Sequence, residues 1–237
     1  MEIAPDILTA PDTALGRRER ERLARRRAML DAALSVFGEK GFDGATLDEV
    51  AERAEFGKGT LYNYFPGGKD EIYLALFDEL VIDGLTDVAR DAFADPSAMA
   101  TPARVRGAFC GFIEALLQHF EDNREHLALF MKDNHRMMLD ADRAAVFASR
   151  FERVIEAVAA PVEAAMASGA LRSLPARPVA HLLMGNVRGH LLAEMDTACM
   201  AAHASGGPAF ATPGEAASFI TTVLFDGLIA PSPADPA

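Results

Sequence analysis

The stretch TLDEVAERAEFGKGTLYNYF, residues 46–65, decides the fold. It starts with Thr46, and Glu49 follows three residues later, which is the signature of a capping box at the beginning of a helix. A short turn at residues 55–57 leads into a second short helix over residues 58–65. Neither helix is long enough to bury its apolar side alone, so the pair predicts a helix-turn-helix that packs on a third helix.

That third helix is expected just upstream. Apolar residues recur at helical spacing between residues 19 and 40, and the pattern ends at Gly41. Residues 17–27 carry seven arginines against two glutamates, a local charge of +5, whereas the chain from residue 76 onward carries −9 and the whole chain −12. This asymmetry favours a basic edge for an anionic partner. The alternative is a solvated helix face with Glu/Arg pairs.

Long amphipathic helices account for the rest of the chain. They are expected over residues 70–92, 102–121, 123–137, 140–168, 177–202 and 214–229, with proline and glycine at the breaks. Helix formers dominate and strand-like runs are scarce, so the predicted fold is all-α. The predicted organisation is a disordered arm at 1–16, a helix-turn-helix domain at 17–70 and a helical domain at 71–230.

Composition excludes several classes of protein. The sequence has neither an apolar run of membrane-spanning length nor the pattern of a signal peptide, which predicts a cytoplasmic protein. Cys110 and Cys199 lack metal-ligand spacing. His119, Asp122 and His126 would share a helix face, but a helix break is expected at residues 121–123, so no metal and no cofactor are predicted. The sequence has no nucleophile motif, and the protein is not expected to be an enzyme.

The second short helix carries side chains suited to DNA. Lys58, Thr60, Tyr62 and Tyr64 are expected to project from it, and an α-helix fits the major groove with its first residues at the base edges. A tyrosine ring suits a thymine methyl group, and its hydroxyl suits a phosphate oxygen. Arg25 to Arg27 are expected to touch backbone phosphates at the edge of the same site.

The run from residue 46 to residue 77 resembles the DNA-binding region of the TetR family of transcriptional regulators, and the resemblance covers about residues 20–80. The match includes the recognition-helix pattern KGTLYxYF. The resemblance implies a set of DNA contacts: Thr46, Lys58, Gly59, Thr60, Tyr62, Asn63, Tyr64 and Lys69. For Thr46, a purely structural role as a helix cap is an equal alternative.

Three features depart from the family pattern. Glu55 occupies a turn position that favours a positive φ, and Gly57 replaces a serine cap. One extra residue separates Phe65 from Lys69, which makes the phosphate contact of Lys69 less secure than that of Tyr64.

The resemblance also implies the function of the helical domain. It implies a homodimer that binds a palindromic operator as a ligand-responsive repressor, with a pocket for a small apolar effector. The candidate pocket residues are Phe112, Leu116, Phe130, Phe147 and Phe151. The expected dimer helices carry apolar residues at Leu182, Leu183, Val187, Leu191, Phe219, Ile220, Val223, Leu224 and Leu228. The alternatives are a DNA-binding protein whose body binds only protein partners, and an enzyme.

Overall fold

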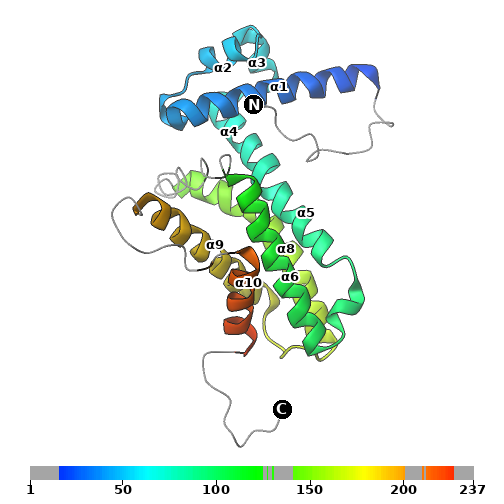
Figure 1. Ribbon diagram of the computed structural model, residues 1–237. Coiled ribbons are helices and arrows are strands. Elements are labelled where there is room, and N and C mark those ends of the chain that lie inside the picture. The colour runs from blue at the N-terminus through cyan, green and yellow to red at the C-terminus, as the bar shows by residue number, and fades with distance from the viewer. Residues whose placement is uncertain are drawn as a thin grey trace, which may run out of the picture. The chain divides into compact units, whose positions relative to one another are not determined.

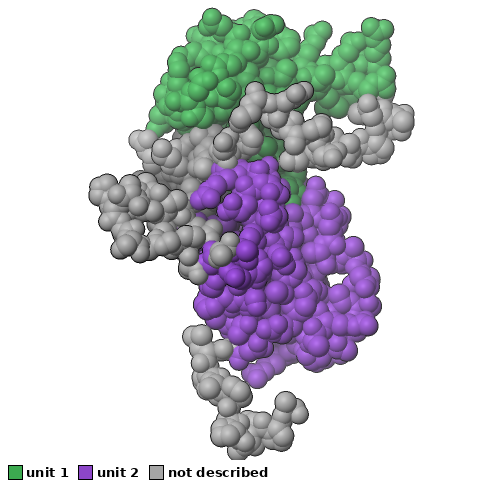
Figure 2. All heavy atoms as spheres, in the orientation of Figure 1, with its two compact units in different colours: residues 1–84, 125–141 green, residues 85–124, 142–237 purple. Residues whose placement is uncertain are grey.

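The computed structural model describes residues 16–124, 127, 130, 141–200, 210 and 212–226. All regular elements within these ranges are helices, which confirms the predicted all-α fold (Figure 1). Most of the predicted arm and of the predicted helix over 123–137 lies outside the described residues. The chain divides into two compact units, coloured in Figure 2: residues 1–84 with 125–141, and residues 85–124 with 142–237.

The first unit contains α1 and the two short helices. Its elements are α1 (Arg17–Gly44), α2 (Leu47–Arg53), α3 (Lys58–Tyr64), α4 (Gly68–Phe77) and the π-helical segment η1 (Asp78–Ile82). The regular part of α1 ends at Gly41, as predicted, because this glycine adopts a left-handed φ of 72°. The last residues of α1 then turn the chain toward α2.

Aromatic rings form the centre of the first unit. The ring of Tyr73 from α4 lies 4.9 Å from Phe42 and 6.1 Å from Phe37. Phe130, more than fifty residues further along the chain, packs edge-on against Tyr73 at 5.1 Å and also contacts Phe77 at 5.7 Å. The unit extends to Gly84, because α4 and η1 supply part of its core.

The second unit is a bundle of longer helices. It holds most of α5 (Asp83–Ala92), and then η2 (Pro96–Met99), α6 (Pro102–Asp122), α8 (Ala141–Ala167), α9 (Ala176–Met200), α10 (Pro213–Thr221) and η3 (Thr222–Asp226). Thr101 and Thr212 cap α6 and α10, and each helix has proline as its first residue. These local signals set the starts of the two helices that contact each other most extensively.

The core of the second unit is built on α6. Phe109 and Phe112 are fully buried, and the ring of Phe93 contacts both of them, at 4.9 and 5.0 Å. Phe225 of η3 reaches Phe109 at 5.6 Å. No helix within the described ranges is long and apolar enough to cross a membrane.

The chain is helical without a break from Gly68 to Ala92, through α4, η1 and α5. The sequence predicts a single helix over 70–92, and the structure adds the five π-helical residues of η1 in its middle. A π-helical turn widens a helix locally and often marks a functional position.

Candidate nucleic-acid interface

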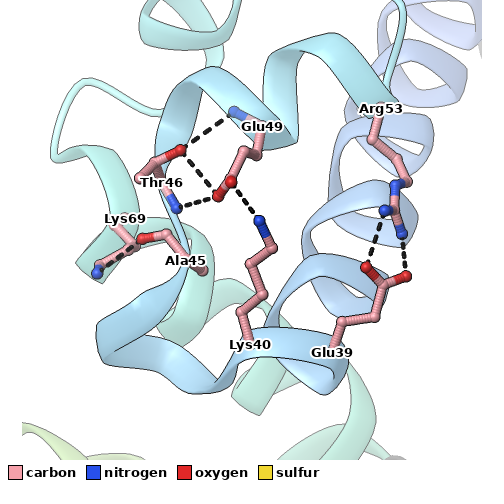
Figure 3. A network of polar contacts seen from close by, with 7 residues as sticks. All are labelled: Glu39, Lys40, Ala45, Thr46, Glu49, Arg53 and Lys69. Atoms are coloured by element: carbon pink, nitrogen blue, oxygen red, sulfur yellow. Dashed lines mark hydrogen bonds and ion pairs between the residues drawn. The ribbon is translucent and has the colours of Figure 1, made fainter.

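A reciprocal pair of hydrogen bonds starts α2 (Figure 3). The hydroxyl of Thr46 accepts from the backbone N–H of Glu49 at 3.3 Å, and the Glu49 carboxylate accepts from the backbone N–H of Thr46 at 3.0 Å, which confirms the predicted capping box. Lys40 of α1 also donates to this carboxylate. The hydrogen bonds from Lys40 and Thr46 lower the pKa of Glu49 from 4.5 to about 2. The start of α2 is thereby fixed to α1.

The turn between α2 and α3 adopts the strained conformation that the resemblance to the family pattern implies. Glu55 has a φ of 59° and is the one non-glycine residue with a positive φ in the described ranges. Such a conformation costs about 1 kcal/mol relative to glycine. Gly57 occupies the N-cap position of α3 and provides no side-chain hydrogen bond. The first N–H groups of α3 are therefore left without a side-chain cap.

Helix α3 has one anchored side and one outward side. Leu61 is buried, and Phe65 is buried immediately after the helix. Lys58, Gly59 and Asn63 are exposed, 42% of Tyr62 is exposed, and Thr60 and Tyr64 are partly exposed. The structure therefore brings six of the eight predicted contact residues together on one accessible helix. Whether they contact DNA remains a prediction.

The ammonium group of Lys58 has a partner that the sequence did not reveal. It lies 2.9 Å from the carboxylate of Asp48, at the start of α2, and both side chains are exposed. The hydrogen bond and charge of Asp48 raise the pKa of Lys58. Lys58 therefore carries its charge on the outward side, and a phosphate would compete with Asp48 for it.

Lys69 is held by the backbone at the α1–α2 corner. Its ammonium donates to the carbonyl oxygens of Phe42 at 2.7 Å and Ala45 at 3.1 Å (Figure 3 shows the second bond), and it lies 4.5 Å from the centre of the Phe42 ring. These contacts fix the corner that precedes Thr46. A phosphate contact by Lys69 remains a prediction and would have to be made beside these bonds.

The three arginines expected at the edge of the site have different environments. Arg26 pairs with Glu79 of η1, and its guanidinium lies 5.4 Å from the centre of the Phe65 ring. Arg27 pairs with Asp31 at 2.8 Å. Arg25 is exposed and has no partner among the described residues. Arg26 and Arg27 therefore stabilise the unit itself, which periodicity alone could not show.

The candidate effector residues do not fall in one unit. Phe112 and Leu116 are fully buried on α6, and Phe147 and Phe151 are partly exposed on α8, all in the second unit. Phe130 belongs to the first unit, where it packs on α4. A pocket formed by these residues remains a prediction.

His119 is a largely buried polar residue, and the only role that its sequence pattern suggested was metal binding. It lies three residues beyond Leu116 and seven beyond Phe112, so the three share one face of α6. Its Nε2 atom is buried and has no hydrogen-bond partner in the described part of the chain. Burial lowers the pKa of His119, which keeps the ring neutral at physiological pH.

Helices α9 and α10 form an open groove on the second unit, with a volume of about 520 Å³. Its lining includes Leu182 and Phe219, which are 60% and 54% exposed. Leu183, Val187 and Leu191, which the sequence grouped with Leu182, are buried within their own unit. The exposed apolar side of α9 is therefore narrower than the sequence suggests.

No metal centre emerges from the described residues. They contain no group of three His, Cys, Asp or Glu side chains that could hold an ion. His126, which was part of the metal hypothesis, lies outside the described residues. The side chain of Cys199 is also not described, and Cys110 is a free, partly exposed thiol.

The capped α2, the tight turn and the outward side of α3 define a helix-turn-helix head of the kind found in DNA-binding regulators. Residues 29–76 match the family model described as "Bacterial regulatory proteins, tetR family". The first unit is thus similar to the DNA-binding region of the TetR family.

Known regulators and solved structures are similar to this chain. The HTH-type transcriptional regulator RutR of Escherichia coli K12 is 33% identical over 93 residues, which are 38% of this chain and 43% of RutR. BetI of Rhizobium meliloti is 28% identical over 193 residues, covering 73% of this chain and 92% of BetI. The structure of Bacillus subtilis FadR in complex with stearoyl-CoA is similar with a TM-score of 0.57 at 14% identity, covering 86% of this chain and 99% of FadR. RutR and BetI are both transcriptional regulators, in agreement with the prediction that the chain is not an enzyme.

Proposed function

We propose that this chain is a DNA-binding transcriptional regulator that binds a palindromic operator as a homodimer and releases it when a small apolar effector binds. The observation that carries the proposal is the outward side of α3, where Lys58, Tyr62 and Tyr64 are accessible while Leu61 and Phe65 hold the helix from behind. A helix so held can enter the major groove without disturbing the core. A cytoplasmic location follows from this function.

Dimer formation is proposed from the exposed side of α9. Leu182, Gly185, Gly189 and Leu192 recur at three- and four-residue spacing, so they share one face. All four are exposed, and a Cβ added at either glycine would meet no atom within 4 Å. A second copy of this helix could therefore approach closely along this stripe, with Phe219 of α10 beside it. Two heads are needed because one two-turn helix reads too few bases to be specific.

The effector proposal rests on the shared face of α6. Phe112 and Leu116 offer apolar contact, and His119 at the end of the same stripe offers a buried ring nitrogen without a partner in the described part of the chain. An effector with an apolar body and one hydrogen-bonding group would satisfy both features. The stearoyl-CoA found in the FadR structure has such a long apolar body, which supports this effector class.

A selection of bound sequences from random double-stranded DNA tests the DNA-binding proposal. The expected product is an inverted repeat whose half-sites have centres about 34 to 36 Å apart, or farther apart by whole helical turns. Light scattering at micromolar concentration should give the mass of a dimer. Failure to enrich any sequence would overturn the DNA-binding function, and a monomer at that concentration would overturn the dimer.

A thermal-shift screen tests the effector proposal against the alternative of a body that binds only protein partners. An effector raises the melting temperature by mass action, and the shift should shrink in a His119→Leu variant if Nε2 contacts the polar group. A screen of fatty acids, acyl thioesters and cationic apolar compounds without any stabilising hit would favour the protein-partner alternative.

A further inference from the structure

The first three turns of α1 do not contribute to the core of the first unit. Residues 16–25 are exposed except for Glu19, which is partly exposed, and the first buried residue of the helix is Met29. Residues 17–27 nevertheless carry seven arginines against two glutamates. Packing therefore does not account for the length of this helix or for its charge.

Three of these arginines form a stripe. Arg18, Arg22 and Arg25 have the spacing i, i+4, i+7, which places them on one face of the helix. Arg18 and Arg25 have no partner among the described residues, and Arg22 is 3.7 Å from Glu19. This stripe is the least neutralised part of the basic segment, because Arg26 and Arg27 are bound within the unit.

The stripe lies on the side of α1 that faces the helix-turn-helix. The same three- and four-residue steps lead from Arg25 through Met29, Ala33 and Val36 to Lys40. The ammonium of Lys40 pairs with Glu49 of α2. The arginines therefore continue the α2 side of α1 beyond the end of the short helices. Figure 1 shows this dark-blue half of α1 running past α2 and α3.

We infer that Arg18, Arg22 and Arg25 form a second DNA-contacting surface that binds backbone phosphates next to the base pairs read by α3. The twelve residues of α1 before its first buried side chain span about 18 Å at 1.5 Å per residue. That length matches about five phosphates of one DNA strand at 3.4 Å each, so the start of one α1 can neutralise several of them. The inference rests on the proposed function and adds a sequence-independent contact to it.

The experiment compares the salt dependence of operator binding by the full chain, its variants and a matched control. The test variant is Arg18→Gln/Arg22→Gln/Arg25→Gln, since glutamine keeps helix propensity while it removes the charge. The control is Arg90→Gln/Arg124→Gln/Arg172→Gln, which removes the same charge from exposed positions of the second unit. A third variant replaces the stripe arginines by lysine.

The slope of log Kobs against log salt concentration should flatten in the glutamine stripe variant by up to about five, because six phosphate contacts per dimer each contribute about 0.9. The control should keep the parent slope, and the lysine variant should stay close to it. The selected operator sequence should be unchanged, since phosphates carry no base information. Equal slopes in the stripe variant and the control would overturn the inference while leaving the regulator intact; a parent protein that binds no DNA would overturn the proposed function instead.

Discussion

Asp48 is positioned to weaken the binding of Lys58 to DNA. Its carboxylate pairs with Lys58 on the outward side of the head, and it adds a negative charge where phosphates would approach. We expect Asp48→Asn to raise operator affinity by about two- to fivefold per head, a range typical of exposed ion pairs. Fluorescence anisotropy with a labelled operator measures this change.

The matched control is Glu52→Gln, on the same helix, where the carboxylate is exposed and has no partner in the described ranges. Glu52→Gln should change operator affinity less than Asp48→Asn does. Weaker binding by Asp48→Asn would instead mean that the carboxylate itself accepts a hydrogen bond from a cytosine amino group.

Lys58 and Tyr64 should affect binding without affecting stability. Both are accessible on a helix held by Leu61, so Lys58→Ala and Tyr64→Phe should weaken operator binding at an unchanged urea midpoint. Loss of one phosphate contact per head by Lys58→Ala should flatten the salt slope by about two per dimer. Leu61→Ala should behave in the opposite way and destabilise the fold by about 2 to 5 kcal/mol. If either surface variant binds as the parent does, that residue is not a contact.

Glu49 should make the stability of the head depend on pH. Its pKa is depressed from 4.5 to about 2 in the folded state, so its contribution is present above pH 4.5 and is lost as the pH falls toward 2. Glu49→Gln should therefore lower the urea midpoint at pH 7, and the difference from the parent should shrink between pH 4.5 and 3. The exposed Glu52→Gln serves again as control, and a difference independent of pH would show that packing rather than charge is responsible.

Residue-scale features were predictable where they are local. The capping box of Thr46 and Glu49 follows from spacing within a few residues, and the positive φ at Glu55 follows from the resemblance to the family's turn; the structure confirms both. The partners of Lys58 and Lys69 lie ten or more residues away along the chain, so only the folded structure reveals them.

At the scale of elements, the exposed face of α9 formed by Leu182, Gly185, Gly189 and Leu192 allows a direct test of the proposed dimer. Gly185→Leu would place a large side chain where a second α9 is proposed to approach, and overpacking costs about 1 to 3 kcal/mol. We expect the dimer dissociation constant to rise about five- to 150-fold, as measured by sedimentation equilibrium. The matched control is Gly107→Leu on α6, also a helical glycine with nothing within 4 Å of an added Cβ. Equal dimerisation by both variants would exclude this stripe from the interface.

Element boundaries follow the sequence wherever a capping residue or proline marks them. Gly41 ends the regular part of α1 as predicted, and α6 begins at the expected residue 102, directly after the cap Thr101. Helix α10 begins after the cap Thr212, one residue before the expected start at 214. The π-helical turn of η1 was not predictable, because no residue type marks it and its hydrogen-bond pattern depends on the surroundings. The burial of Leu183, Val187 and Leu191 was likewise not predictable. Periodicity predicts that a helix has an apolar face, but it does not show which element packs against that face.

At the scale of the whole molecule, effector and operator should oppose each other. The helix-turn-helix head continues into a stretch that is helical without a break from Gly68 to Ala92. We therefore expect a conformational change in the second unit to alter the head through this stretch. The expected coupling is about 1 to 3 kcal/mol, or five- to 150-fold in operator affinity. Titration of operator with protein saturated by effector measures it.

Linkage provides the control for this prediction. Operator must weaken effector binding by the same factor, so calorimetry with and without operator should return one coupling free energy. A compound that stabilises the chain yet leaves operator affinity unchanged at saturation is not an inducer. If every stabilising compound behaves so, the regulator lacks an effector switch and the protein-partner alternative gains support.

The fold class and the head were predictable at this scale, because the helix-turn-helix is encoded within about fifty consecutive residues. An effector pocket stays a prediction, since it depends on how helices distant in sequence meet. Phe130, a candidate pocket residue, packs against Tyr73 in the first unit, a contact that periodicity cannot show.

The position of Phe130 has a consequence for biosynthesis. The aromatic core of the first unit is closed by a residue that follows Phe77 by about fifty positions. At translation rates of about 5 to 20 residues per second, that ring leaves the ribosome about 3 to 10 s after the rings it will cover. During this interval the nascent head exposes Tyr73 and Phe77, so its final folding step must wait for the helices that are synthesised in between.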